Sequence, residues 1–266
     1  MIIPAPNDIA FNLFGIAVYW YGIIMACAIF ISIIAANKLA NFLNIASKKD
    51  IIIAYAPIII IFGILGARLY FCMLNPHYYF AHPLEILDIR EGGLSVHGSI
   101  LAGLLCIYLM SRHYKVTFLH IADVFGCATI LGQAIGRWGN YFNSEAYGLP
   151  VKSQGWGLFI PEGKRISEYS DFSLFHPTFL YESILDLIAF FILFFIIRKF
   201  GKKYIGLTFF SYFILYSIIR FFVEQLRIDS ALNINSLPIA IWVSFFFFIS
   251  GIIGITVILV RNNKRV

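Results

Sequence analysis

The chain has 266 residues, of which 60% are hydrophobic and 13% are charged, and its mean hydropathy is +0.83. A soluble domain of this length cannot cover so much apolar surface with polar side chains, so the composition excludes soluble globular, disordered and collagen-like proteins. The formal net charge of +6 resides mostly in short loops between apolar runs, which indicates membrane topology and argues against a nucleic-acid partner.

Apolar runs long enough to cross a bilayer, roughly 20 residues each, recur along the chain. The predicted spans cover, in chain order, residues 16–36, 51–74, 93–110, 118–136, 177–197, 204–223 and 238–260. The fourth span is the least regular, because it contains Asp123 and several glycines. Lipid offers the backbone no hydrogen-bond partners, so each span should be helical. We therefore predict an all-α integral membrane protein with about seven transmembrane helices.

The loop charges predict the orientation. The loops after the first, third and fifth spans and the C-terminal tail are rich in Lys and Arg, whereas Asp50 is their single acid. Loops on the opposite side carry most of the acids, so the positive-inside rule places the N-terminus outside and the C-terminus in the cytoplasm. Residues 141–175 form the one sizeable polar stretch, which we interpret as a small outward-facing head within a single membrane domain of residues 1–266.

Polar side chains gather near the predicted outer ends of five spans. They are Tyr21, His97, Arg137, Asn140, His176, Glu182, Arg220 and Glu224. Ionisable groups within a membrane are costly and usually belong to functional sites or to structural pairs. Scattered positions would place such groups on both sides, so their convergence on one side favours a site near the outer leaflet.

Arg137 and Asn140 are three residues apart and share a face if the helix continues past Gly136. A guanidinium at this depth can bind a phosphate through two parallel hydrogen bonds. The alternative is an arginine whose charged end simply extends from the end of the helix to the membrane surface. Gly132, Gly136 and Gly139 allow either close helix packing or a sharp turn.

Arg220, Glu224 and Arg227 have the spacing of one helical face. An internal ladder of ion pairs explains Glu224 and Arg227 at least as well as a function does. Arg220 lies deepest in the predicted span, so it is the better functional candidate of the three.

His97 is flanked by glycines near the start of the third span, where Ser99 and Gly103 predict a face for close packing. Histidine suits proton transfer near neutral pH, although a single histidine in a helix is more often a packing residue. Arg68, Asp123 and Asp186 are interpreted as structural charge pairs, with Arg68 a possible counter-ion for Glu182 and Asp186.

A longer motif lies around Arg137. Residues 136–148 read GRWGNYFNSEAYG, which matches the signature G-R-x-G-N-F-x-N-x-E-x-x-G at every fixed position except Tyr141. Four further motifs occur in the order that the same family has: WYG at 20–22, GGLSVHG at 92–98, HPTFLYE at 176–182 and RFFVEQLR at 220–227. With these motifs the chain resembles the bacterial prolipoprotein diacylglyceryl transferases over most of its length. It departs from them at Ser99, where the family usually has glycine, and at residues 231–240, which lack the family's glutamine.

The resemblance implies a transferase of the bacterial inner membrane. It would move the diacylglyceryl group of phosphatidylglycerol to the lipobox cysteine of preprolipoproteins, which forms a thioether and releases glycerol phosphate. The resemblance assigns catalysis to His97, Arg137 and Arg220, with His97 as candidate base. It assigns substrate binding to Arg137 and to Tyr21, Asn140, Asn143, Glu145, Gly148 and Glu224. It implies no metal and no cofactor.

A multi-span transporter with a polar site near the outer leaflet is the alternative function, because buried charges on several helices suit a transporter as well. The polar groups become sparse toward the predicted cytoplasmic ends, whereas a transporter needs them through the whole depth. The one-sided distribution therefore favours the transferase.

Overall fold

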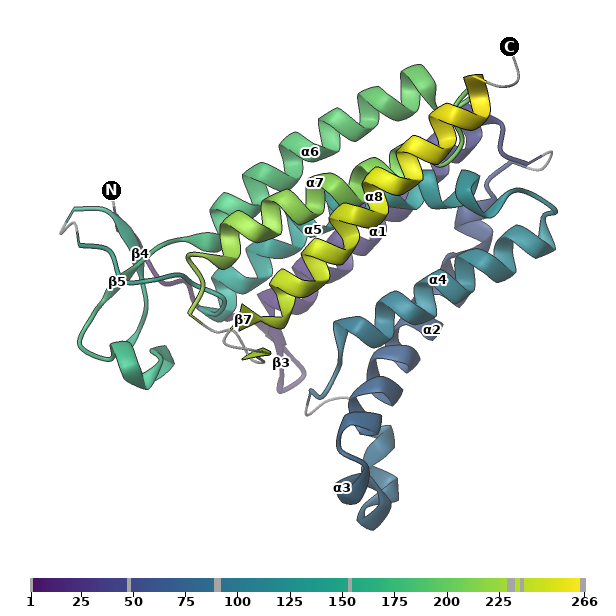
Figure 1. Ribbon diagram of the computed structural model, residues 1–266. Helices are drawn as coiled ribbons and strands as arrows, with labels where there is room; N and C mark the ends of the chain where they lie inside the picture. The colour runs from purple at the N-terminus through teal and green to yellow at the C-terminus, as the bar shows by residue number, and fades with distance from the viewer. Residues whose placement is uncertain are drawn as a thin grey trace. The chain divides into compact units, whose positions relative to one another are not determined.

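The computed structural model describes residues 2–46, 49–88, 92–152, 155–228, 233–234 and 237–263 (Figure 1). The helices are α1 (Trp20–Leu43), α2 (Ile51–Leu74), α3 (Pro76–Ala81), α4 (Val96–His113), α5 (Phe118–Asn143), α6 (Thr178–Phe200), α7 (Leu207–Glu224) and α8 (Ile239–Asn263). Single 3-10 turns are η1 (Pro83–Leu87), η2 (Glu162–Lys164) and η3 (Ser167–Tyr169). The short strands are β1 (Ile2–Ile3), β2 (Ile9–Leu13), β3 (Ile16–Tyr19), β4 (Gly157–Phe159), β5 (Leu174–Phe175), β6 (Asn233–Ile234) and β7 (Leu237–Pro238).

Within the described residues, six helices are long and apolar enough to cross a membrane: α1, α2, α5, α6, α7 and α8. Helix α4 occupies the third predicted span but does not join them, because its 18 residues include His97, Arg112 and His113 at its ends. The prediction of an all-α membrane protein is therefore confirmed. Six of the seven predicted spans are supported.

The start of the first span was predicted wrongly. Ile16–Tyr19 forms β3, which pairs antiparallel with β2, and α1 begins only at Trp20. Phe14 and Gly15 make the turn between the strands with φ of 49° and 83°, a left-handed conformation that glycine adopts at little cost. A short apolar run suits a strand as well as a helix, so hydropathy alone could not place this boundary.

The chain forms two compact units. The larger unit consists of Met1–Ala35 and Asp123–Val266, and the smaller unit of Ala36–Ala122. In the larger unit α7 packs between α6 and α8, and these helices run side by side in Figure 1.

Three glycines of α5 let α1 approach closely in the larger unit. A Cβ atom at Gly139 would lie 2.9 Å from the Tyr21 ring, and one at Gly132 would lie 2.6 Å from Ser32 Oγ. A Cβ atom at Gly136 would lie 3.4 Å from Met25 Sδ. Of the two roles predicted for these glycines, the structure shows close helix packing, and α5 continues unbroken to Asn143.

Asp123 is fully buried and caps a neighbouring helix. Its two carboxylate oxygens accept the backbone N–H groups of Gly206, at 2.6 Å, and Phe209, at 2.8 Å, at the N-terminus of α7. A carboxylate at this position satisfies exposed helix donors and complements the helix dipole. Asp123 is therefore structural, but the charge pair predicted for it was wrong, because its partner is a helix end instead of a basic side chain.

In the smaller unit, α2 and α4 cross where glycines meet. A Cβ atom at Gly66 would lie 2.5 Å from Ala102 Cβ, and Ser99 Oγ donates a hydrogen bond to the Gly63 carbonyl at 3.0 Å. A Cβ atom at Gly103 would have no neighbour within 4 Å among the described residues of this unit, so Gly103 is not part of the contact with α2. The packed small residue is Ala102, one position earlier.

Backbone carbonyls of the smaller unit hold the Arg68 guanidinium, which also lies 5.3 Å from the centre of the Tyr79 ring. Its guanidinium donates hydrogen bonds to the carbonyls of Glu85, Ile86, Gly92 and Gly93 at 2.5 to 3.2 Å. Arg68 therefore organises the segment between α2 and α4.

The polar segment predicted as a head folds as a small sheet whose core continues into the start of α6 through Phe179. Strand β4 pairs with β5 and, in parallel, with β1 from the N-terminal segment. Tyr147, Leu158 and Phe175 are buried in its core. Tyr147 also links two loops, because its hydroxyl donates to the Lys164 carbonyl and accepts from the Ile166 N–H, both at 2.9 Å. The contribution of β1 was not predicted from the sequence.

Candidate active site

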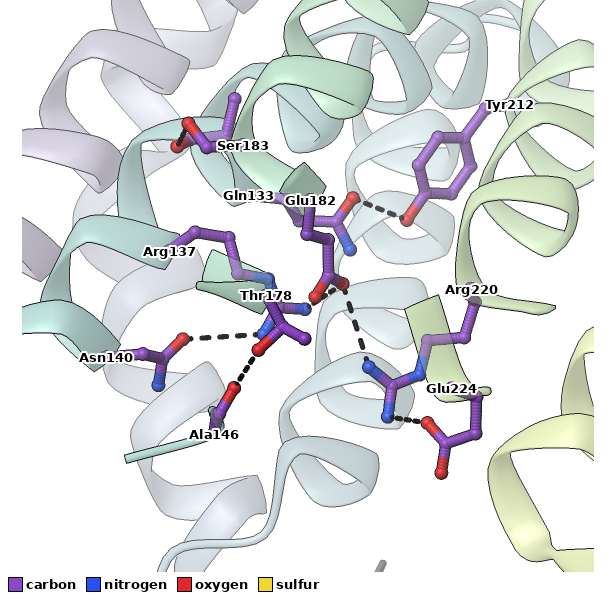
Figure 2. A network of polar contacts seen from close by, with 11 residues as sticks. Gln133, Arg137, Asn140, Ala146, Thr178, Glu182, Ser183, Tyr212, Arg220 and Glu224 are labelled. Atoms are coloured by element: carbon purple, nitrogen blue, oxygen red, sulfur yellow. Dashed lines mark hydrogen bonds and ion pairs between the residues drawn. The ribbon is translucent and has the colours of Figure 1, made fainter. Parts of the chain in front are cut away.

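Two arginines from different helices share one carboxylate oxygen in the larger unit (Figure 2). Oε1 of Glu182, on α6, lies 2.5 Å from Nη2 of Arg137 on α5 and 3.7 Å from Nη1 of Arg220 on α7. The Glu182 side chain is 3% exposed, and the Arg137 side chain is 21% exposed. Burial weakens screening by water, so the carboxylate interacts strongly with the two guanidiniums that it bridges.

Glu224 completes the charge pairing one turn along α7. Its Oε2 lies 2.6 Å from Nη2 of Arg220, as the i, i+4 spacing predicted. Arg227 was predicted on the same helical face, but α7 ends at Glu224. Arg227 instead follows the helix, where its backbone pairs with Gly148, so the helical face predicted for Arg227 was wrong.

The network continues along α5 through amide side chains. Nη1 of Arg137 donates to Asn140 Oδ1 at 3.5 Å, and Nδ2 of Asn140 donates to Glu145 Oε1 at 3.0 Å. Asn143 Nδ2 donates to the same oxygen at 3.3 Å. The predicted shared face of Arg137 and Asn140 is confirmed.

A strained backbone around Glu145 directs its side chain back toward α5. Its neighbours Ser144 and Ala146 both have positive φ, at 54° and 55°. Non-glycine residues rarely adopt this conformation, and it tends to occur where a functional geometry is held by the surrounding structure. Here the Glu145 N–H donates to the Asn140 carbonyl at 3.0 Å, and Thr178 on α6 donates through its hydroxyl to the Ala146 carbonyl.

A cavity of about 500 Å³ lies at the end of this chain of contacts. It is lined by Asp8, Tyr19, Tyr21, Gly22, Asn143, Glu145 and Lys164. Three of these residues, Tyr21, Asn143 and Glu145, were predicted to bind substrate. The structure thus brings together substrate-binding candidates from α1, from the end of α5 and from the loop that follows it.

Gly148 occupies a place where no side chain fits. A Cβ atom there would lie 2.8 Å from the Leu226 carbonyl and 2.9 Å from both His176 Cβ and Thr178 Cγ2. Its N–H donates to the His176 carbonyl at 2.9 Å. Close packing around position 148 therefore explains why this residue is glycine.

His176 was expected near the start of a helix. It precedes α6, and its Nδ1 lies 3.2 Å from the Tyr181 hydroxyl.

His97 belongs to the smaller unit, where it is the second residue of α4. Its side chain is exposed, and its ring centroid lies 6.0 Å from that of Tyr70.

The sequence interpretation missed two features of this site. Glu182 was placed among the converging polar groups, with Arg68 as a possible counter-ion, but its bridging of Arg137 and Arg220 was not predicted. Asp8 and Lys164 were counted only as loop charges, yet both line the cavity. A signal for Glu182 existed, because it ends the HPTFLYE motif, whereas no local pattern marks Lys164.

Comparison with known proteins agrees with the resemblance. A family model described as prolipoprotein diacylglyceryl transferase matches residues 8–257. A protein of Clostridium novyi named phosphatidylglycerol–prolipoprotein diacylglyceryl transferase is 43% identical over 260 residues, which is 97% of this chain and 98% of the relative. Proteins of the same name from Clostridioides difficile and Thermotoga maritima are 39% and 40% identical, over 97% and 93% of this chain and 98% and 83% of their own lengths. Because both the family model and these relatives extend over most of its length, the chain belongs to the prolipoprotein diacylglyceryl transferase family.

Proposed function

We propose that this protein transfers the diacylglyceryl group of phosphatidylglycerol to the lipobox cysteine of preprolipoproteins. The observation that carries the proposal is the convergence of Arg137 and Arg220 on Glu182 Oε1, at 2.5 and 3.7 Å. Family membership and the printed names of the relatives supply the substrate classes. The protein is a multi-pass bacterial membrane protein, and we place its N-terminus outside and its C-terminus in the cytoplasm, in accord with the loop charges.

The proposed reaction is a substitution at carbon. The cysteine sulfur attacks the carbon of the diacylglyceryl group that carries the phosphate. An S–C bond forms, and the bond between this carbon and the phosphate oxygen breaks. Glycerol phosphate leaves with the electrons of that bond, and the thiol proton passes to His97. A base raises the thiolate fraction, because a free thiol has a pKa of about 8.5.

Arg137 and Arg220 would hold the phosphate and stabilise the negative charge that develops on the leaving group. A guanidinium has five N–H donors, so these arginines retain donors beyond those that contact Glu182, Asn140 and Glu224. Nε of Arg137 is buried and has no hydrogen-bond partner within the described part of the chain. Such an unsatisfied donor suits an incoming phosphate oxygen.

Purified protein in detergent, incubated with phosphatidylglycerol and a lipobox-cysteine peptide, tests the proposal. Mass spectrometry should show the peptide gaining the diacylglyceryl mass, with the rate reduced roughly 100-fold or more in Arg137→Ala, the effect typical of losing a charge-stabilising donor. Arg198→Ala is the matched control, because this exposed arginine lies in the last turn of α6, at the opposite end from Glu182. A folded wild-type sample that leaves the peptide unmodified, beside an active relative, would contradict the proposal.

A further inference from the structure

The cavity of the larger unit includes a cation that the proposed chemistry does not use. We propose that this cavity binds the glycerol headgroup of the phospholipid and that Lys164, held by Asp8, selects an uncharged alcohol headgroup over a cationic one. The inference rests on the proposed function, since it names the part of the lipid that this cavity accepts.

The backbone positions both members of this pair. Nζ of Lys164 lies 3.2 Å from Asp8 Oδ2. The Lys164 carbonyl accepts the hydroxyl of Tyr147, which is buried in the head core, and the Asp8 carbonyl accepts the Trp20 N–H at the start of α1, at 3.0 Å. Lys164 and Asp8 thus connect the head to the first turn of α1 across the cavity.

Stability does not explain the pair. The side chains of Lys164 and Asp8 are 38% and 37% exposed, and ion pairs with this much water around them contribute little to folding. Their place on the wall of a cavity, beside Tyr21 and Glu145, points to a ligand instead.

The chemistry of the wall suits an alcohol. An alcohol hydroxyl both donates and accepts hydrogen bonds, and the lining supplies both kinds of partner. Lys164 and the Tyr21 hydroxyl donate, while the carboxylates of Asp8 and Glu145 accept. The amides of Asn140 and Asn143 both bond Oε1 of Glu145, and among the described residues no hydrogen bond reaches its Oε2. A headgroup ammonium offers Lys164 no hydrogen-bond acceptor and meets it as a like charge. Asp8 is paired with Lys164, so Glu145 is the remaining carboxylate of the lining that attracts an ammonium.

The cavity is also connected to the proposed phosphate position. Glu145 bonds Asn140, and Asn140 bonds Arg137, so one continuous chain of polar contacts joins the wall to a guanidinium. The headgroup alcohol of a phospholipid is covalently joined to its phosphate. A phosphate at Arg137 with its alcohol beside Glu145 and Lys164 therefore accounts for both features with one ligand. The volume of about 500 Å³ lies within the range of small-molecule sites.

The test compares Lys164→Met, which keeps the aliphatic stem and removes the charge, with Lys164→Arg, which keeps the charge. Lys152→Met is the matched control, an exposed head lysine that does not line the cavity. Two quantities are measured in detergent: equilibrium binding of fluorescent phosphatidylglycerol and phosphatidylethanolamine, and the KM for each substrate in peptide lipidation.

Lys164→Met should weaken phosphatidylglycerol binding and raise the lipid KM roughly tenfold, as expected for one lost hydrogen bond from a charged donor. Its preference for phosphatidylglycerol over phosphatidylethanolamine should fall, while the KM for the peptide stays unchanged. Lys164→Arg and Lys152→Met should resemble the wild type. Asp8→Asn is a second variant should Lys164→Met fold poorly. It removes the carboxylate that holds Lys164 and should also weaken phosphatidylglycerol binding, but it keeps the Lys164 charge and so should not lower the preference for phosphatidylglycerol.

Unchanged lipid binding and unchanged headgroup preference in both Lys164→Met and Asp8→Asn would overturn the inference. The failure of the proposed function has a different signature. Wild-type protein that binds phosphatidylglycerol through Lys164 yet lipidates no peptide would contradict the transferase reaction and leave the headgroup site supported.

Discussion

Oε1 of Glu182 lies 2.5 Å from Nη2 of Arg137, so a carboxylate on α6 neutralises the guanidinium that α5 contributes. The same oxygen is 3.7 Å from Arg220, whose other amino group pairs with Glu224. Basic and acidic side chains thus alternate along one network of contacts. These ion pairs offset the cost of desolvating two arginines at a depth where an isolated cation is strongly disfavoured.

Removal of the Glu182 carboxylate should therefore destabilise the larger unit. In Glu182→Ala, Arg137 loses its closest anionic partner, and breaking a buried pair in this way costs about 3–5 kcal/mol. Glu182→Gln should lose less, because the amide oxygen still accepts a hydrogen bond from Arg137. Thermal unfolding in detergent measures the effect, with Glu162→Ala, an exposed acid of the head, as control. A Glu182→Ala protein that unfolds at the wild-type temperature would show that the pair contributes nothing to folding.

Asp123→Ala should loosen the start of α7 without removing any residue of the candidate active site. The substitution leaves the N–H groups of Gly206 and Phe209 without their carboxylate, and an unsatisfied buried donor costs about 1–3 kcal/mol. Hydrogen exchange should accelerate in the first turn of α7, while Asp123→Asn, which keeps one acceptor, should show a smaller change. Asp171→Ala, at an exposed head position, serves as control. Equal protection of this turn in wild type and Asp123→Ala would refute the capping role.

The smaller unit should lose stability in acid through Asp50. The Asn37 amide, at 2.6 Å, and then the Asn41 amide, at 2.9 Å, donate to Asp50 Oδ1 and hold the pKa of this carboxyl below its ordinary value. A folded-state pKa that is lowered contributes stability above the unfolded pKa of about 4, and this stability is lost as the pH falls through the lowered value. The difference in unfolding temperature between wild type and Asp50→Asn should therefore shrink below about pH 4. A difference that stays constant between pH 7 and pH 2.5 would contradict this coupling.

The sequence by itself determined the class of the protein and part of one network of polar contacts. Apolar runs near bilayer length have few stable structures other than helices, which is why residues 51–74 were predicted to the residue as α2. The motif at residues 136–148 identified Arg137, Asn140, Asn143 and Glu145, and the structure places all four in one chain of contacts. Short-range spacing sufficed there, because these residues lie on one helix and the loop that follows it.

Only the tertiary structure decided which distant residues meet. Glu182 could not be assigned to Arg137 and Arg220 from spacing, since they lie on three helices and helical periodicity says nothing about which faces pack together. Lys164 reaches Asp8 across 156 positions of sequence, so no local pattern links them. The boundary between β3 and α1 also depends on pairing with β2, which hydropathy does not record. Local apolar periodicity therefore determined the helices, and long-range packing, which depends on the whole folded chain, determined the geometry of the charges.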